Sequence, residues 1–544
     1  MTRIHLPPFL LAPLVLCATL PGAAPFAAAQ APASQPTSAD SEAIKAELGA
    51  NDTVQVVRGN LSNRAGSVPA HTLHPDAQWY PDASFGLFIH WGVASVGAIN
   101  ISWPMIPGRA IEADPVTDKA ERARILSEGD WNLDGKPNSI TPNQYWAMEE
   151  RFNPQAYDPD KWIKAAKDAG FAYVVLTTRH HEGFALWPSA FGNFDTRNHM
   201  GGRDLLRPYV EACRKYGVKV GFYYSVADWY FDRDYMNFLY HSGKANPWLP
   251  SLDADLKPRT TRHSAEDISA HNAAYYALIR GQIEELLTRY GKIDLIWFDV
   301  KPSFTNGEKF DANTCMPIER IRALQPGILI NPRMHGPENT DFVTFERRLP
   351  SPLPKFGWAE LCNPWTSSWP YTEDSRTHKE LPYRAGGAVL GELALCRSLG
   401  INYLLDVGPK STGELSEVAY ANMAVVAGWM KGNRESVFGT QPLPKGETAA
   451  DGLSPTIPAT FRRGTRYLFA VPKFRENHPY PEYQLPAKDL ILSLSGTKKP
   501  IAVTLLGTGM PLEYTYADGK ISVPLAAAQR TPLVDVVKVD LAPN

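Results

Sequence analysis

The chain has 544 residues, of which 44% are hydrophobic and 21% are charged, and its formal net charge at pH 7 is -2. This length exceeds one small domain and leaves room for a barrel with an accessory domain. The balanced charge, without a basic run, argues against nucleic acid or an anionic membrane surface as partners. The 14 Trp and 23 Tyr residues suit a large core and also a protein that stacks sugar rings on aromatic side chains.

The N-terminus has the features of an export signal. Arg3 supplies a positive charge, residues 6–20 are mostly apolar, and residues 27–29 (AAA) offer a small-residue cleavage site. We therefore expect residues 1–29 to be removed and the protein to be periplasmic or secreted. Residues 30–69 are expected to form a leader, because their first part is rich in Ala, Ser, Pro and Gln.

From residue 70 to residue 438, short apolar strands alternate with amphipathic helices. Strands are expected at 84–89, 171–178, 218–224, 293–298, 328–331 and 402–407, and helices at 160–169, 205–216, 272–289, 317–324, 387–399 and 423–431. Near-continuous apolar strands of this kind are typical of parallel strands covered by helices on both sides. The number of repeats favours a closed barrel over an open sheet. We predict an α/β fold, a TIM-like (β/α) barrel that forms the catalytic domain.

The last hundred residues have a different pattern of residue types. In residues 439–544, short β-branched runs at 467–471, 489–494, 501–506 and 534–539 are separated by Gly, Pro, Asn and Asp. This pattern predicts a C-terminal antiparallel β-sandwich. That domain either braces the barrel or binds carbohydrate. Four Cys remain after removal of the signal, too few for a disulfide scaffold, and we expect buried free thiols rather than a disulfide.

The carboxyl ends of barrel strands face the reaction site, so the residues at these ends are candidates for chemistry. The expected strands end at His90, at residues 179–182 (RHHE), at 223–225 (YYS), at 297–299 (WFD) and at 331–333 (NPR). Polar and aromatic side chains in these segments include His180, His181, Tyr223, Trp297, Asp299 and Arg333. The adjacent His180 and His181 can both face the site only where regular strand pairing has ended. Gly183 makes such a departure easy.

This set of residues fits glycoside hydrolysis, which needs two carboxyl groups on either side of the bond that breaks. Asp299 is the first candidate, although an Asp at this position could also only cap the next segment. Glu346 is the candidate for the second, and Glu338, Glu360 and Glu182 compete with it. The run from His180 to Glu182 could also bind a metal, but it lacks the usual zinc-ligand spacing, so we expect no metal and no cofactor.

Several long segments, in order, resemble the α-L-fucosidases of glycoside hydrolase family 29. They are residues 79–97 (WYPDASFGLFIHWGVASVG), 179–187 (RHHEGFALW), 219–230 (KVGFYYSVADWY), 293–299 (IDLIWFD) and 401–415 (INYLLDVGPKSTGEL). The likeness covers roughly residues 75–440. It implies an exo-acting enzyme that removes terminal α-L-fucose from a fucosylated oligosaccharide or glycoconjugate.

The resemblance also implies roles for individual residues. Asp299 would be the nucleophile of a retaining double displacement, and Glu346 would be the general acid and base. Substrate contacts would come from His90, Trp103, His180, His181, Tyr223, Trp297 and Arg333. Two departures stand out: Ser102 occupies a position where many members have Glu, and residues 107–144 form a long segment.

Two other functions remain open on the sequence alone. The same machinery could act on a related sugar such as an α-L-galactoside. The chain could also be a glycan-binding homologue without catalysis. The sequence leaves the oligomeric state undecided, a homo-oligomer included.

Overall fold

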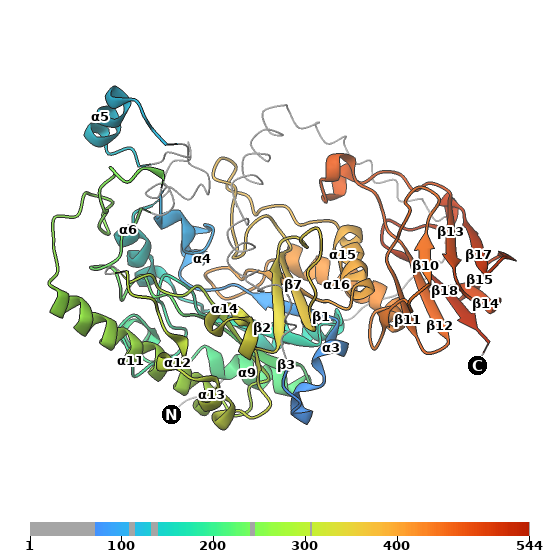
Figure 1. The fold of residues 1–544 in the computed structure, drawn as a ribbon, viewed down its shortest axis with the longest axis horizontal. Coiled ribbons are helices and arrows are strands. Elements are labelled where there is room, and N and C mark those ends of the chain that lie inside the picture. Colours follow the sequence, from blue (N-terminus) through green and yellow to red (C-terminus); the bar gives the residue numbers. More distant parts are fainter. Residues whose placement is uncertain (1–70, 108–114, 132–139, 240–244, 305–306, 543–544) are drawn as a thin grey trace, which may run out of the picture. The chain divides into compact units, whose positions relative to one another are not determined.

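The computed structural model describes residues 71–107, 115–131, 140–239, 245–304 and 307–542. The expected export signal (1–29) and leader (30–69) lie outside the described residues. Within them, eight parallel strands form one sheet in the order β5-β4-β3-β2-β1-β8-β7-β6. Because β1 pairs with both β2 and β8, the strands follow one another around a barrel in chain order (Figure 1). The predicted (β/α) barrel is confirmed.

The eight barrel strands are short and almost entirely buried, as expected of strands covered by helices. They are β1 (Phe85–Ile89), β2 (Tyr173–Arg179), β3 (Lys219–Ser225), β4 (Leu295–Asp299), β5 (Leu329–Ile330), β6 (Phe342–Glu346), β7 (Trp358–Pro364) and β8 (Asn402–Val407). The sequence did not predict β6 (Phe342–Glu346) or β7. In β7, Glu360 and Asn363 interrupt the apolar run. Both residues are nevertheless buried in the barrel.

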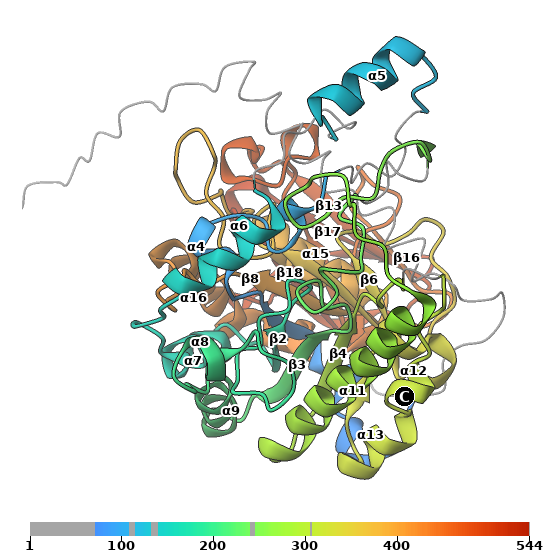
Figure 2. The ribbon, with the colours of Figure 1, turned by 90° about the vertical axis from the view of Figure 1, so that its left-hand side faces the viewer.

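Helices connect most of the strands, and α9 and α11 lie along the outside of β3 and β4 (Figure 2). The barrel helices are α7 (Pro159–Asp168), α9 (Leu206–Lys215), α11 (Ala265–Arg289), α13 (Ile318–Leu324), α15 (Gly386–Ser398) and α16 (Glu417–Asn433). The other helices are α3 (Tyr80–Ala83), α4 (Ala94–Gly97), α5 (Lys119–Glu128), α6 (Pro142–Trp146), α8 (Thr196–His199), α12 (Ala312–Cys315) and α14 (Pro332–His335). Helix α11 begins at Ala265 rather than at residue 272, because Ser264 and Asp267 form a capping box there.

Strands β5 and β6 are joined by hydrogen bonds of a single residue, Asp341, rather than by a regular ladder of backbone hydrogen bonds. The Asp341 backbone donates to the carbonyl of Ile330 at 2.9 Å, and the Asp341 carboxylate accepts from the Ile330 N–H at 2.8 Å. The same carboxylate accepts from Arg322 at 2.9 Å and from the Thr72 N–H at 2.8 Å. Asp341 is fully buried, so this carboxylate takes the place of missing backbone acceptors at the seam.

Two antiparallel sheets follow the barrel, as predicted. One has the order β10-β13-β17-β16 and the other β15-β14-β18-β12-β11-β9. Their strands are β9 (Gln441–Pro442), β10 (Thr448–Ala450), β11 (Ala459–Arg462), β12 (Thr465–Ala470), β13 (Leu490–Ser495), β14 (Pro500–Leu505), β15 (Met510–Pro511), β16 (Thr515–Ala517), β17 (Lys520–Leu525) and β18 (Asp535–Leu541). Leu, Val and Ile side chains from both sheets share one apolar core, which is the arrangement of a sandwich.

Contacts between α15, α16 and the C-terminal strands are close. The Trp429 indole donates to the backbone carbonyl of Val534 at 2.7 Å. A Cβ atom at Gly391 would lie only 2.6 Å from Val471, so the absence of a side chain there permits the packing. These contacts agree with a bracing role for the C-terminal domain.

The cysteines of the described residues form no disulfide. Cys213, Cys315, Cys362 and Cys396 are all free and buried, as predicted. Among the described residues, no helix has the length and apolar character needed to cross a membrane.

The seam at Asp341 gives a prediction for stability. Replacing Asp341 with Ala should lower the free energy of unfolding by about 3 kcal/mol, because it leaves Arg322 and two backbone N–H groups without their acceptor. Urea unfolding followed by tryptophan fluorescence measures this loss. The control is Asp76→Ala, which removes an exposed ion pair with Lys292 and should change stability far less. Equal effects of the two substitutions would contradict the proposed closure.

Candidate active site

The carboxyl ends of the barrel strands surround one small pocket. Its lining contains all nine residues singled out from the sequence: His90, Trp103, His180, His181, Tyr223, Trp297, Asp299, Arg333 and Glu346. They lie in three strands (β3, β4 and β6), directly after two others (β1 and β2), in α14 and in the short helix η2 (Trp103–Met105). The pocket also contains four residues that sequence reasoning missed: Phe88, Val300, Cys362 and Trp369.

One guanidinium group joins the two candidate carboxylates. Arg333 donates from Nη1 to Asp299 Oδ1 at 2.7 Å and from Nη2 to Glu346 Oε2 at 2.8 Å. Its guanidinium also stacks over the Trp297 ring, 4.3 Å from the ring centre. Because the five donors of Arg form a rigid fork, this geometry holds Asp299 and Glu346 on the same side of the pocket.

Asp299 is held as an anion. Burial alone would raise its pKa, but the positive charge and the hydrogen bond of Arg333 bring the pKa of Asp299 well below its ordinary value. The second oxygen, Oδ2, accepts from the Tyr223 hydroxyl at 2.8 Å. Burial and the Asp299 charge raise the pKa of Tyr223, so this phenol remains a donor. The result is an ionised carboxylate whose orientation is fixed at both oxygens.

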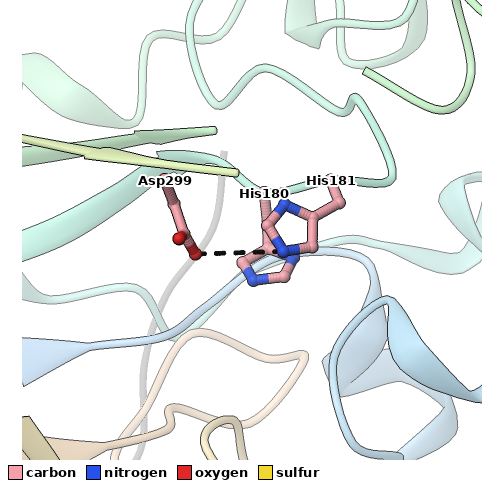
Figure 3. Close-up of side chains that lie close together, drawn as sticks. All are labelled: His180, His181 and Asp299. Carbon is pink, nitrogen blue, oxygen red and sulfur yellow. Dashed lines mark ion pairs between the residues drawn. The ribbon is translucent and has the colours of Figure 1, made fainter. Parts of the chain in front are cut away.

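Two of the three imidazoles are anchored through Nδ1 by serine hydroxyls. His180 Nδ1 lies 2.6 Å from Ser102 Oγ, and His181 Nδ1 lies 2.7 Å from Ser225 Oγ. The Nε2 atom of His181 points toward Asp299 and lies 3.9 Å from Oδ2 (Figure 3). Burial holds the pKa of His181 well below its ordinary value, so His181 is neutral.

The third imidazole has a carboxyl partner instead. His90 Nδ1 lies 2.6 Å from Asp406 Oδ1, on the neighbouring strand β8. Burial lowers the pKa of His90 and raises the pKa of Asp406, because both charged forms lose their hydration. Asp406 was not singled out from the sequence, because nothing in a strand of type NYLLDV separates a functional Asp from a structural one.

The adjacent His180 and His181 both reach the pocket because regular pairing ends just before them. The pairing of β2 with β3 shifts register between Thr177 and Arg179, and Gly183 then adopts a positive φ of 97°. Arg179 points elsewhere, and its guanidinium donates to the buried Asp228 at 2.7 Å. The departure expected at Gly183 is therefore present.

The competing glutamates lie in other places. Glu338 is exposed to solvent. Glu182 is buried beside Ser102, which donates to it at 2.6 Å. Glu360 lies within the barrel, where it accepts from Trp297 Nε1 at 3.0 Å and from the hydroxyls of Tyr173 and Tyr80. Of the four glutamates considered, only Glu346 lines the pocket.

For some of the missed residues, no local sequence pattern indicates that they belong to the site. Cys362 lies on β7, the strand that was not predicted, and Trp369 lies in the loop that follows it. A lone Cys or Trp in a segment of unknown conformation cannot be assigned to a site by spacing. Arg347 packs its guanidinium on Trp369, 5.1 Å from the ring centre, and so supports this wall of the pocket.

The donor set could also hold a cation. One nitrogen of His180, one nitrogen of His181 and one oxygen of Asp299 lie within 4.8 Å of one another. However, Arg333 donates to Asp299 at 2.7 Å, so a cation bound to Asp299 would lie beside the positive charge of the guanidinium. This arrangement disfavours a metal ion at Asp299.

Comparison with known proteins settles the family. The model of the family described as alpha-L-fucosidase matches residues 65–435. The chain belongs to this family. It is accordingly a glycoside hydrolase. Tissue alpha-L-fucosidase of Rattus norvegicus is 26% identical over 402 residues, 70% of this chain and 76% of the relative. Alpha-L-fucosidase of Branchiostoma floridae is 23% identical over 474 residues, 84% of this chain and 91% of the relative.

Solved structures of fucosidases share the fold. Alpha-L-fucosidase isoenzyme 1 from Paenibacillus thiaminolyticus is 25% identical, with a TM-score of 0.61, and the match covers 86% of this chain and 99% of that one. A GH29 alpha-L-fucosidase from Bacteroides thetaiotaomicron is 22% identical, with a TM-score of 0.60, over 87% of this chain and 97% of that one. The second likeness shows the fold alone.

The buried Glu360 gives this fucosidase-family barrel a pH-dependent stability. Burial raises the pKa of Glu360 from 4.5 to about 7, although its hydrogen bonds oppose the shift. Between these two values the folded protein keeps a proton that the unfolded chain releases, so stability falls as the pH rises from 4.5 to 7 and then levels off. The loss should be about 3 kcal/mol.

Glu360→Gln removes the ionisable group and keeps the shape. Unfolding of this variant in urea should therefore show a smaller decrease in stability between pH 4.5 and 7 than unfolding of the parent enzyme. The exposed Glu338→Gln serves as the control and should reproduce the parent curve. A Glu360→Gln curve that is parallel to the parent curve would show that Glu360 does not hold its proton in the folded state.

Proposed function

We propose that this protein is an exo-acting, retaining α-L-fucosidase that removes terminal fucose from glycans, with Asp299 as nucleophile and Glu346 as acid and base. The observation that carries the proposal is that Arg333 donates to both Asp299 and Glu346. These two hydrogen bonds hold both carboxylates on the same side of the pocket. Retaining glycosidases need such a pair, about 5–5.5 Å apart.

The first step is attack by Asp299 on the anomeric carbon. Tyr223 and Arg333 hold one oxygen each, and Arg333 keeps the carboxylate ionised. The bond from the anomeric carbon to the leaving oxygen breaks as the bond to Asp299 forms, and Glu346 gives its proton to the leaving oxygen.

The second step reverses the roles. Glu346, now a carboxylate, takes a proton from water, and this water attacks the anomeric carbon and releases Asp299. Each step inverts the anomeric centre, so the product keeps the α configuration. Both carboxyl side chains are largely buried, which limits the number of water molecules around the covalent intermediate.

The lining supports a deoxy-sugar as substrate. Three imidazoles offer hydrogen bonds to ring hydroxyls, whereas Phe88, Val300 and Trp369 add an apolar surface that suits a methyl group. A covalent intermediate formed from 2-fluoro-fucosyl fluoride was trapped in a glutamate-to-glutamine variant of the similar enzyme from Bacteroides thetaiotaomicron, which supports the same sequence of steps here. The expected export signal supports a periplasmic or secreted location.

Asp299→Gly tests the nucleophile. The parent enzyme should hydrolyse 4-nitrophenyl α-L-fucoside faster than the corresponding α-L-galactoside, because a hydroxymethyl group would replace the methyl group against the apolar surface. Asp299→Gly should lower kcat on the order of 10⁴-fold or more. Added azide should restore turnover and give the β-fucosyl azide, because a single displacement inverts the anomeric centre.

Other results would change the conclusion. Faster turnover of the galactoside would reassign the sugar, and turnover of neither substrate by the folded parent enzyme would favour a glycan-binding homologue. If azide restored activity but gave the α-azide, Asp299 would not be the nucleophile.

Glu346→Ala tests the acid and base. With a natural fucosylated oligosaccharide, kcat/KM should fall by about 10²–10⁴-fold, because the leaving sugar needs a proton. With a 2,4-dinitrophenyl leaving group, the first step should be nearly as fast as in the parent enzyme, and azide should give the α-fucosyl azide. Glu338→Gln is the control and should behave as the parent enzyme. An equal loss with both leaving groups would remove Glu346 from this role.

A further inference from the structure

Glu182, Ser102 and His180 form a buried chain of hydrogen bonds behind the pocket. We propose that Glu182 and Ser102 are positioning residues that fix the tautomer of His180, so that its Nε2 accepts a hydrogen bond from one hydroxyl of the sugar. This inference rests on the proposed function, because the group that donates is a hydroxyl of the substrate.

The hydrogen bonds that link Glu182, Ser102 and His180 are short. Ser102 Oγ lies 2.6 Å from Glu182 Oε2 and 2.6 Å from His180 Nδ1. The backbone N–H of Glu182 donates to the same Oγ at 3.1 Å. All three side chains are at least nine-tenths buried, so water does not compete freely for these bonds.

Counting protons then fixes the direction of each bond. A carboxylate accepts hydrogen bonds and donates none, so Ser102 must give its only proton to Glu182. Ser102 Oγ can therefore only accept from His180, and the proton of that bond must lie on Nδ1 of His180. In the neutral imidazole this leaves a lone pair on Nε2, on the side of the ring that lines the pocket.

The adjacent imidazole follows the same logic with a different acceptor. Ser225 Oγ donates to the backbone carbonyl of Ala227 at 2.6 Å, so it can only accept from His181 Nδ1. A backbone carbonyl cannot be replaced by substitution, whereas Glu182 can. Of these two imidazoles, only His180 has a last acceptor that is a side chain, Glu182, and that can therefore be replaced.

A neighbouring phenol does not change the direction. Burial and the Glu182 charge raise the pKa of Tyr145, which is completely buried near Ser102. Tyr145 therefore stays protonated, and its hydroxyl has no hydrogen-bond partner among the described residues. It leaves the proton count of Ser102 unchanged.

Glu182→Met tests the inference, because it keeps the bulk and removes the acceptor. The Ser102 proton is then free to turn toward His180 Nδ1, and Nε2 no longer has to be an acceptor. The assay compares kcat/KM for 4-nitrophenyl α-L-fucoside with its 2-, 3- and 4-deoxyfluoro analogues. Fluorine cannot donate a hydrogen bond, and its electronic effect on the reaction is the same in both enzymes.

In the parent enzyme, one fluorinated position should carry a penalty roughly tenfold greater than in Glu182→Met. Glu285→Gln changes a carboxylate that is hydrogen-bonded to Trp187 and Ser189 outside the pocket, and it should keep the parent pattern. Unchanged penalties at all three positions in Glu182→Met would overturn the inference.

A second measurement needs no variant at Glu182 and no turnover. In the parent enzyme labelled with ¹⁵N-histidine, the signals of His180 are assigned by their loss in His180→Asn. We expect a protonated Nδ1 and an unprotonated Nε2 at neutral pH, and a protonated Nε2 would overturn the inference. Because this spectrum does not depend on activity, failure of the parent enzyme to hydrolyse fucosides would count against the proposed function alone.

Discussion

The interaction on which the site depends is the double hydrogen bond of Arg333. Burial alone would raise the pKa of Asp299, and the charge of Arg333 brings this pKa well below its ordinary value. Arg333 supplies one positive charge to both Asp299 and Glu346 and fixes their separation through the rigid fork of its donors. It can do so because it stacks on Trp297 and lies at the start of α14, directly after the shortest strand of the barrel. The chemistry of the site therefore depends on where one guanidinium is anchored.

The layer below the pocket maintains that arrangement. Trp297, the ring under Arg333, donates to Glu360, and Glu360 in turn accepts from tyrosines that pack in the barrel interior. On one side of this layer, Asp341 closes the seam between β5 and β6 with its carboxylate. Polar groups inside a barrel cost desolvation energy unless they are hydrogen-bonded, and here they form specific links from strand to strand. The same links position the aromatic wall of the pocket.

The three histidines of the pocket are each held by a residue outside the pocket lining. Each of the three imidazoles has Nδ1 bound to a partner behind it: Ser102, Ser225 or Asp406. Such partners decide which ring nitrogen carries the proton, and therefore which hydrogen bonds a sugar can make. At the position where many family members have a glutamate, this chain has Ser102, and a second residue, Glu182, supplies the carboxylate. In this chain the Glu182 carboxylate acts on His180 through the Ser102 hydroxyl group.

The sequence by itself determined the class of fold and a larger set of residues at the strand ends, because apolar strands of parallel sheets and polar residues at their ends leave a strong local pattern. The resemblance to the fucosidase family reduced this set and added Trp103, and the nine residues that resulted all line the pocket. The strands that the sequence missed include β6, β7, with Glu360 and Asn363 in its interior, and β17, whose short alternating run ends in Pro524 and Leu525. Only the tertiary structure decided among the glutamates, identified Asp406, Cys362 and Trp369, and revealed the chain from Glu182 to His180. These features depend on contacts between residues far apart in sequence: Ser102 and Glu182 meet across two loops, and Arg333 bridges two strand ends. Local patterns carry no information about such distances, which are set by the closure of the barrel.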